Sequence, residues 1–259
     1  MKIVCGLLMS LATLAADIRV VPVPATSEPD AVKLSLVFPK RGRTENSTPI
    51  QVQLRLNGYA VGTRTDVPRA KEIYNDSEGQ AVHVIIDNNT YFEINESLID
   101  ALDDNADYYV QVLEKNIPFK LKEGFHLLRA FPVRSFNESL KGDNCFVASF
   151  FYFKSTKGPQ PFDLTTPFLT YNEPMGEYPF LAGEPILLDF YISNCQLSQD
   201  GYKVRLTIDG NERMLTEWTP YYVYGLSKGK HTFRLELLDQ RNMPVAGQLS
   251  DHTEVIVLK

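Results

Sequence analysis

The stretch IQVQLRL, residues 50–56, alternates strictly between apolar and polar side chains. In an extended chain, the apolar side chains at 50, 52, 54 and 56 fall on one face and the polar ones at 51, 53 and 55 on the other. This alternation is typical of an antiparallel β-strand that buries one face and exposes the other. The stretch therefore predicts a half-buried sheet.

Similar short runs, rich in Val, Ile, Tyr and Phe, follow at 83–87, 125–131, 146–153, 203–209 and 232–238. They are separated by Gly, Asn, Asp and Pro, which supply the backbone angles that turns require. The pattern predicts an all-β fold of β-sandwiches, each with about seven strands in roughly 100 residues. One short helix is expected, at ESLIDALDDN, residues 96–105.

The chain repeats itself. LKEGFHLLR at 121–129 returns as LSKGKHTFR at 226–234, HVIIDNN at 83–89 as RLTIDGN at 205–211, and TPIQVQLRLNG at 48–58 as EPILLDFYISN at 184–194. Landmarks that recur in one order, with a period of about 120 residues, indicate an internal duplication. We expect the nine-residue phrase to form a corner at which Gly124 or Gly229 reverses the chain and His126 or His231 begins the next strand. The alternative is that the two histidines ligate a metal together.

The length allows two domains. The chain has 259 residues, 44% hydrophobic and 22% charged. Its first residues, MKIVCGLLMSLATLAA, combine one Lys, a short apolar run and small residues, which is typical of a cleavable signal peptide; a buried first strand is the alternative. The sequence predicts a signal peptide at 1–16, a sandwich domain at 17–156, a linker at 157–167 and a second sandwich domain at 168–259. No other stretch is apolar for long enough to cross a bilayer.

Charge and cysteine content exclude several classes of protein. The net charge is −6 and no tract is rich in Lys or Arg, so no nucleic-acid partner is expected. Without the signal peptide two cysteines remain, Cys145 and Cys195, in different predicted domains. We expect two separate thiols rather than a disulfide framework. No spacing suggests a metal site or a cofactor.

A resemblance accompanies these patterns. The segments at 83–94, 119–141, 167–178, 184–194 and 226–247, including PFLTYNEPMGEY and EPILLDFYISN, resemble a family of exported, uncharacterised bacterial proteins with tandem immunoglobulin-like domains. The likeness covers nearly all of the chain after residue 16. It implies two tandem immunoglobulin- or fibronectin type III-like β-sandwich domains, and it implies no substrate, cofactor or catalytic residue.

The first copy departs from the second in two connections. One is the B–C loop at 59–80, which in an immunoglobulin-like sandwich lies at the same end as the F–G loop, here 132–144. Aromatic and Arg side chains are common anchors of binding surfaces. We therefore predict a ligand-binding surface on these loops, although ordinary mobile loops are the alternative. Its candidate residues are Tyr59, Arg64, Arg69, Tyr74, Arg134 and Phe136.

The other expanded connection, 93–107, is acidic, with Glu93, Glu96, Asp100, Asp103, Asp104 and Asp107. Calcium prefers such oxygen ligands, but the ordered acidic positions of an EF-hand loop are absent. A solvated helix face is the expectation, and a calcium site is the alternative.

Motifs of common enzymes are missing: there is no nucleophile elbow, phosphate-binding Gly loop or HExxH. We therefore expect a non-catalytic binding or envelope-assembly protein that is exported to the periplasm or cell surface. Its expected partner is a protein or a glycan of the envelope. The alternative is a carbohydrate-active enzyme, or its accessory carbohydrate-binding module, because a pair of catalytic carboxylates leaves no sequence motif.

Overall fold

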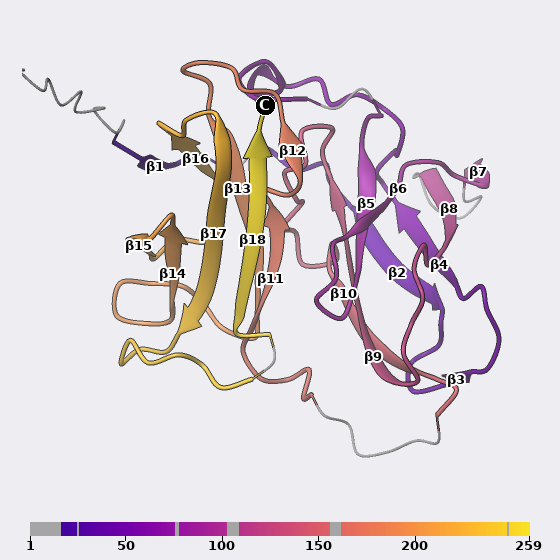
Figure 1. Ribbon diagram of the computed structural model, residues 1–259. Helices are drawn as coiled ribbons and strands as arrows, with labels where there is room; N and C mark the ends of the chain where they lie inside the picture. Colours follow the sequence, from indigo (N-terminus) through magenta and orange to yellow (C-terminus); the bar gives the residue numbers. More distant parts are fainter. Residues whose placement is uncertain (1–16, 25, 76–77, 103–108, 156–161, 248) are drawn as a thin grey trace, which may run out of the picture.

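The computed structural model describes residues 17–24, 26–75, 78–102, 109–155, 162–247 and 249–259. Within these ranges the protein is all-β, and its one helical piece is the 3-10 turn η1 (Pro68–Lys71). Two β-sandwiches lie side by side, one from each half of the chain (Figure 1). The predicted fold of two immunoglobulin-like sandwiches is confirmed. The signal peptide predicted at 1–16 lies outside the described residues.

The first sandwich joins a four-stranded and a five-stranded sheet. The four-stranded sheet has the order β2 (Lys33–Phe38), β4 (Gln51–Asn57), β8 (Tyr109–Asn116) and β7 (Ile99–Leu102). The five-stranded sheet has the order β3 (Thr44–Glu45), β10 (Val147–Phe153), β9 (Gly124–Val133), β5 (Ala81–Ile86) and β6 (Phe92–Ile94). Val52, Leu54 and Leu56 of β4 are fully buried between the sheets, as their alternation predicted.

The second sandwich repeats this arrangement. Its four-stranded sheet has the order β1 (Arg19–Pro22), β16 (Tyr221–Tyr224), β13 (Ile186–Ser193) and β11 (Phe168–Glu173). Its five-stranded sheet has the order β12 (Glu177–Tyr178), β18 (Asp251–Leu258), β17 (Gly229–Leu238), β14 (Lys203–Ile208) and β15 (Asn211–Leu215). In both sandwiches the two-residue edge strand, β3 or β12, runs parallel to its neighbour, and every other strand pair is antiparallel.

The two sandwiches differ at one edge. The place that β7 occupies in the first four-stranded sheet is occupied in the second by β1, which comes from the beginning of the chain. Figure 1 shows this indigo strand beside the orange strands of the second half. The sequence analysis assigned residues 17–156 to the first domain, whereas Arg19–Pro22 is part of the second sandwich. The predicted linker at 157–167 is only partly described.

The repeated nine-residue phrase forms the same corner in both sandwiches. Gly124 and Gly229 begin β9 and β17 with φ angles of 134° and 131°, a region that favours glycine. Nδ1 of His126 lies 2.8 Å from Oδ2 of Asp87, and Nε2 lies 2.7 Å from the carbonyl oxygen of Lys122. The nine-residue phrase and Asp87, which lies in the repeated segment at 83–89, are therefore parts of one corner.

His231 makes the corresponding contacts in the second sandwich. Its Nδ1 lies 2.6 Å from Oδ2 of Asp209, and its Nε2 lies 2.7 Å from the carbonyl oxygen of Ser227. Each histidine has both ring nitrogens occupied within its own sandwich. The corner prediction explains the repeat, whereas a metal site shared by the two histidines has no support.

The short helix predicted at 96–105 is wrong. Residues Ile99–Leu102 form strand β7, which pairs with β8 in antiparallel register. A helix of one or two turns is marginal by itself, and pairing with the edge of an existing sheet satisfies the same backbone groups. Residues 103–105 lie outside the described ranges.

The outer face of the first five-stranded sheet packs against the outer face of the second four-stranded sheet. Phe131 of β9 meets Tyr191 of β13, with ring centroids 4.9 Å apart. Phe168 of β11 packs in one apolar cluster with Leu127 of β9. No helix among the described residues is long and apolar enough to span a membrane.

Candidate functional site

The two loops predicted to form a binding surface do meet. The amide of Thr65 in the B–C loop donates to Oγ of Ser135 in the F–G loop at 2.9 Å. The amide of Ser135 donates in return to Oγ1 of Thr65 at 3.1 Å. Both residues are buried, so the contact fixes one loop against the other.

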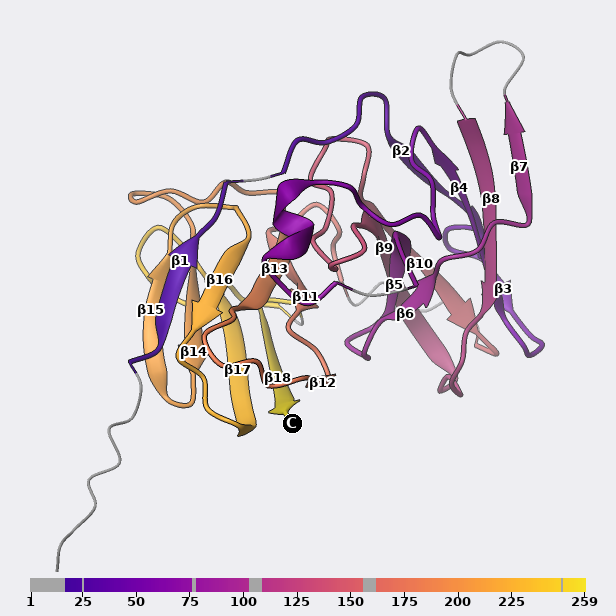
Figure 2. The same cartoon turned by 90° about the horizontal axis from the view of Figure 1, so that it is seen from above.

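One side of the joined loops packs against the second sandwich. Phe136 is 2% exposed and packs in one apolar cluster with Ala70 and Ile73 near η1 and with Leu187 and Tyr222 of the second sandwich. Figure 2 shows η1 lying over β13. The loops of the first half are therefore part of the contact between the sandwiches.

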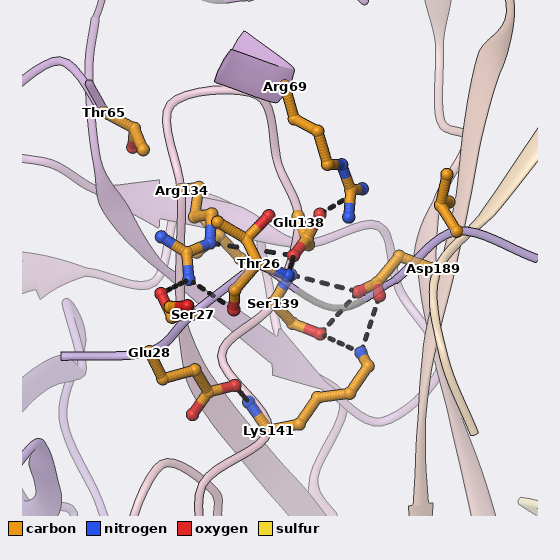
Figure 3. Close-up of polar contacts among 12 residues, drawn as sticks. Thr26, Ser27, Glu28, Thr65, Arg69, Arg134, Glu138, Ser139, Lys141 and Asp189 are labelled. Carbon is orange, nitrogen blue, oxygen red and sulfur yellow. Dashed lines mark hydrogen bonds and ion pairs between the residues drawn. The ribbon is translucent and has the colours of Figure 1, made fainter. Parts of the chain in front are cut away.

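An ionic cluster lies beside this apolar contact (Figure 3). Glu138 forms ion pairs with Arg69 of η1 and, at 3.7 Å, with Arg134. Arg134 also donates from Nη2 to the carbonyl oxygens of Thr26 and Ser27, at 3.1 and 2.7 Å. Burial raises the pKa of Glu138 above its usual value, although the charge on Arg69 opposes the shift. Arg134 and Glu138, each 3% exposed, hold the N-terminal segment against the first sandwich.

Asp189 of β13 brings the second sandwich into the same network. It is fully buried, and it accepts hydrogen bonds from Oγ of Ser139 at 2.5 Å, from Nζ of Lys141 at 2.6 Å and from Nδ2 of Asn172 at 2.8 Å. Nζ of Lys141 also donates to Oγ of Ser139 at 2.8 Å. Serine and lysine can act as nucleophile and base. Here the serine hydroxyl is buried and already donates to Asp189, so the group serves as a link between the two halves.

A second polar group crosses the interface at Glu173 of β11. Its carboxyl, 1% exposed, accepts hydrogen bonds from the hydroxyl of Tyr91 at 2.7 Å, from the amide of Met175 at 3.1 Å and from the hydroxyl of Tyr178. Burial raises the pKa of Glu173 to about 7, against the opposing effect of these hydrogen bonds. The ring of Tyr91 stacks on that of His83, with centroids 3.7 Å apart.

The six predicted site residues are therefore placed differently from one another. Tyr59, Arg134 and Phe136 are buried, and the expectation that they are exposed anchors is wrong. Tyr59 belongs to the core of the first sandwich, whereas the N-terminal segment covers Arg134 and the second sandwich covers Phe136. Arg69 is half-buried in the ionic cluster and Arg64 is exposed. Tyr74 is 47% exposed. Ligand binding by these residues stays a prediction.

Tyr74 lies on the rim of a surface hollow of about 460 Å³. The remaining wall comes from the second sandwich: the β12–β13 loop, the ends of β16 and β18, and the start of β1. Phe180 and Leu181 of that loop are 36% and 47% exposed, and neighbouring exposed apolar side chains of this size can mark an interaction surface. The hollow thus combines exposed apolar groups from both halves of the chain.

Charged groups of both signs line the same hollow. Asp17, Arg19 and Glu184 belong to its wall, and the guanidinium of Arg19 lies 4.9 Å from the ring centroid of Tyr224. A few polar groups in a mainly apolar pocket are typical of binding sites, where they orient the ligand. A second hollow, of about 340 Å³, is lined by 48–50 and 117–121 at one end of the first sandwich.

Sequence reasoning missed Asp189, Glu173 and Phe180. Asp189 had a readable signal, because it is the one charged residue in the apolar strand ILLDFYIS and acids rarely become fully buried without partners. Glu173 follows the apolar run of β11 in a similar way. Phe180 had no signal, since a single Phe in a Pro- and Gly-containing loop is commonplace.

Metal and thiol chemistry are not prominent in the described ranges. No group of three or more His, Cys, Asp or Glu within them could hold a metal ion. Asp103, Asp104 and Asp107 of the acidic segment lie outside these ranges, so the calcium alternative stays a prediction. Cys145 and Cys195 are free, and burial raises their pKa values to about 12 and about 11. Both thiols are therefore poor nucleophiles near neutral pH.

Comparisons with known proteins complete the description. No protein-family model matches the sequence, and no curated protein matches it. The structure is similar to fibronectin(III)-like modules of CbhA from Clostridium thermocellum, with 12% identity over 87% of this chain and 94% of that one and a TM-score of 0.29. It is also similar to CBD12 from CALX1.2, with 9% identity over 88% and 100% of the two chains and a TM-score of 0.24. A third similar structure is a protein of unknown function from Porphyromonas gingivalis W83, with 11% identity over 88% of this chain and 99% of that one and a TM-score of 0.18. The predicted bacterial family stays a prediction.

Proposed function

We propose that this is a non-catalytic binding or assembly protein of the cell envelope, and that it contacts its partner, a protein or a glycan, at the hollow beside Tyr74. The observation that carries the proposal is the group of exposed apolar side chains, Tyr74, Phe180 and Leu181, around one concave surface. Concave, mainly apolar surfaces with a few polar groups are the usual form of ligand sites.

The interface between the sandwiches supports this assignment. Tyr74 belongs to the B–C loop, which the Thr65–Ser135 contact and the packing of Ile73 hold in place. Its ring also meets the edge of the Tyr178 ring, with centroids 6.4 Å apart. A site assembled from two halves needs them fixed in this way, because a shift at the interface would move Tyr74 away from Phe180.

The location rests on the N-terminal sequence. The apolar run within residues 1–16 is typical of an exported chain, and its removal leaves a first residue near Asp17. Because Asp17 and Arg19 line the hollow, cleavage of the signal peptide before Asp17 would place the new N-terminus at the edge of the site. Intact-mass measurement of the protein from an extracytoplasmic fraction tests this step, and a retained Met1 would contradict it.

Paired substitutions test the site. Tyr74→Ser with Phe180→Ser should weaken binding to an envelope partner or glycan by about 100-fold, since central aromatic anchors contribute most of the affinity at such surfaces. Binding is measured against fractionated envelope proteins and a glycan array. Both side chains are partly exposed, so the thermal midpoint should change little.

Met243→Ser provides the matched control. Met243 is 60% exposed in the 239–251 loop of the second sandwich and is absent from the wall of the hollow. Its replacement should leave binding unchanged. Equal loss of binding in the control and in the double variant would move the contact surface away from the hollow.

A carbohydrate-active enzyme is the second candidate, and one observation favours it. Asp17 and Glu184 both line the hollow, whose walls include the aromatic rings of Tyr74 and Tyr224. Glycosidases use two carboxyl groups on either side of the scissile bond. Hydrolysis of a polysaccharide that is lost in both Asp17→Asn and Glu184→Gln would support the enzyme. Glycan binding without hydrolysis would indicate an accessory binding module.

A further inference from the structure

The second sandwich does not contain all of its own strands. In the first sandwich, residues 95–108 between β6 and β8 supply strand β7, whereas β15 and β16 are joined by only residues 216–220. The equivalent edge position is filled by β1, whose register on β16 is antiparallel with Arg19 opposite Tyr224 and Pro22 opposite Tyr221. The sheet is therefore completed by a segment that precedes the first sandwich in the chain.

The edge of β16 is shaped to receive an extended strand. Ile18 and Val20 pack against the second core, and the intervening Arg19 lies over Tyr224 on the other face. The amide of Val23 donates to the carbonyl oxygen of Pro220 at 2.9 Å, which extends the contact beyond β1. At Gly225 an added Cβ would lie 2.6 Å from the carbonyl oxygen of Asp17, so only glycine lets the chain pass here.

The chain directly after β1 is held by the other sandwich. The amide of Thr26 donates to Glu138 at 3.3 Å, and Glu28 accepts from the amides of Lys141 and, at 2.7 Å, Gly142. Arg69 donates to the carbonyl oxygen of Pro24. The hydrogen bonds of Val23 thus go to the second sandwich, and those of Pro24 and residues 26–28 go to the first. The hydrogen-bond partners of the chain therefore change between Val23 and Pro24.

We propose that the edge of β16 is a strand-acceptor site, and that it accepts residues 17–23 of a second copy of this chain. A strand that pivots after Val23 could leave its own β16 and form the same contacts with the β16 of a neighbour. Exchange of an identical element keeps every native contact, which makes it a low-cost route to association. Residues 26–28 keep their contacts with the first sandwich in both arrangements.

The alternation of the strand argues for a second copy as the occupant. The site requires apolar residues at alternate positions, a cation beside Tyr224 and a close main-chain approach at Gly225, and 17–23 meets all three requirements. Every copy carries this segment at the concentration of the acceptor itself. The exchange gives a mechanism for the assembly part of the proposed function, and it does not require that the hollow binds another ligand.

Disulfide trapping between copies tests the exchange. One full-length chain carries Arg19→Cys and another carries Tyr224→Cys, both in a background with Cys5→Ser and Cys195→Ser. Directly opposed residues of antiparallel strands have Cα separations that suit a disulfide. The two chains are mixed in denaturant, refolded together at several concentrations and oxidised. We expect a disulfide-linked pair of unlike chains, in a fraction that rises with protein concentration.

Two controls make the result decisive. One chain with both substitutions should close internally at low concentration, which shows that the geometry permits the bond. Arg19→Cys mixed with Met214→Cys, exposed on β15 and not opposite β1, should give few linked pairs. If the doubly substituted chain closes but the Arg19→Cys and Tyr224→Cys chains never link above the Met214→Cys background, exchange between copies is excluded. That outcome would not contradict the proposal that the hollow binds a ligand.

Discussion

His126 and His231 stabilise equivalent corners by using both ring nitrogens. In each corner an aspartate in the left-handed region, Asp87 at φ 57° or Asp209 at φ 49°, accepts from the ring and from a backbone amide. At His126, the two acceptors favour the doubly protonated ring. The aspartate and the histidine recur together because neither satisfies the corner alone.

The charge of His126 gives a pH-dependent prediction. Burial by itself lowers its pKa, but the hydrogen bonds to Asp87 and to the Lys122 carbonyl, with the charge of Asp87, raise it above the usual value. A raised folded-state pKa stabilises the fold below the usual histidine pKa, and this contribution is lost as pH rises through the raised value. Asp87→Asn should therefore lower the pKa of His126 in an NMR titration.

The same variant should lose most stability in acid, and its difference from the wild type should shrink as pH rises. Asn tolerates the left-handed backbone at this position, so the change acts on charge and hydrogen bonding. A difference in unfolding free energy that is constant with pH would show that Asp87 does not shift the pKa of His126.

The carboxyl group of Glu173 gives a second pH-dependent prediction. Its pKa is raised from 4.5 to about 7, so folding favours the protonated acid. Wild-type stability should fall as pH rises from about 4.5 to about 7 and then level off from this group's contribution. Glu173→Gln should remove that part of the slope in denaturant unfolding at several pH values. An unchanged slope would mean that Glu173 is ionised throughout.

Because Phe136 and Arg134 are buried, their replacement should lower the stability of the protein. Phe136→Ala removes a buried ring, a change that costs about 3–5 kcal/mol, and Arg134→Ala leaves the buried Glu138 with one cation fewer. The double variant should melt far below the wild type. Arg64→Ala, on an exposed side chain of the adjoining B–C loop, should change stability by less than about 0.5 kcal/mol. Normal melting of the double variant would contradict the packing described for the loops.

Strands β1 and β7 occupy equivalent sheet edges, although nothing in their sequences makes them alike. β7 is a local strand that pairs with β8, whereas β1 reaches β16 from the opposite end of the chain. An edge position requires little more than an extended chain with suitable alternation, so distant segments can fill it.

Removal of β1 should therefore affect one sandwich only. In a chain that begins at Pro24, the edge of β16 loses its hydrogen-bonding partner, and amides of β16 and β13 should exchange faster with deuterium. The first sandwich provides the internal control, because β4 and β8 have no contact with β1. Faster exchange throughout both halves would show that the chain folds as a single unit that cannot lose this strand.

Strand patterns were predictable and strand partners were not. The alternation in β4 and the repeated corners at His126 and His231 are local, so the sequence predicts them well. The strand β7 and the burial of Phe136 depend on β8 and on Leu187, which are distant in the chain. The loops at 59–80 and 132–144 were recognised as converging, but the sheet that covers them was not visible from their own residues.

The two sandwiches are joined by apolar packing as well as by polar networks. Phe131 meets Tyr191, Phe136 meets Leu187 and Tyr222, and Asp189 binds Ser139 and Lys141 across the boundary. Interfaces between tandem domains are often small and polar, which permits relative motion. The packing here favours one fixed arrangement.

Limited proteolysis should reveal this. The Pro-, Gly- and Thr-containing stretch at 155–167 is expected to be cut, but the two fragments should stay together in gel filtration because the interface holds them. The pairing of β1 with β16 also joins the fragments, so Asp189→Ala, which leaves Lys141 without its buried partner, should let them separate only in a chain that begins at Pro24. Separation of the wild-type fragments under native conditions would mean that the interface is weaker than its packing indicates.

The pairing of β1 with β16 also constrains the order of events during biosynthesis. β1 is made about 200 residues before its partner β16. Until then the first strand has no sheet to join, and its apolar residues Ile18 and Val20 remain open to other contacts. The first sandwich can fold around its own core in the meantime. Pairing of β1 with β16 of the second sandwich is then a late step of folding.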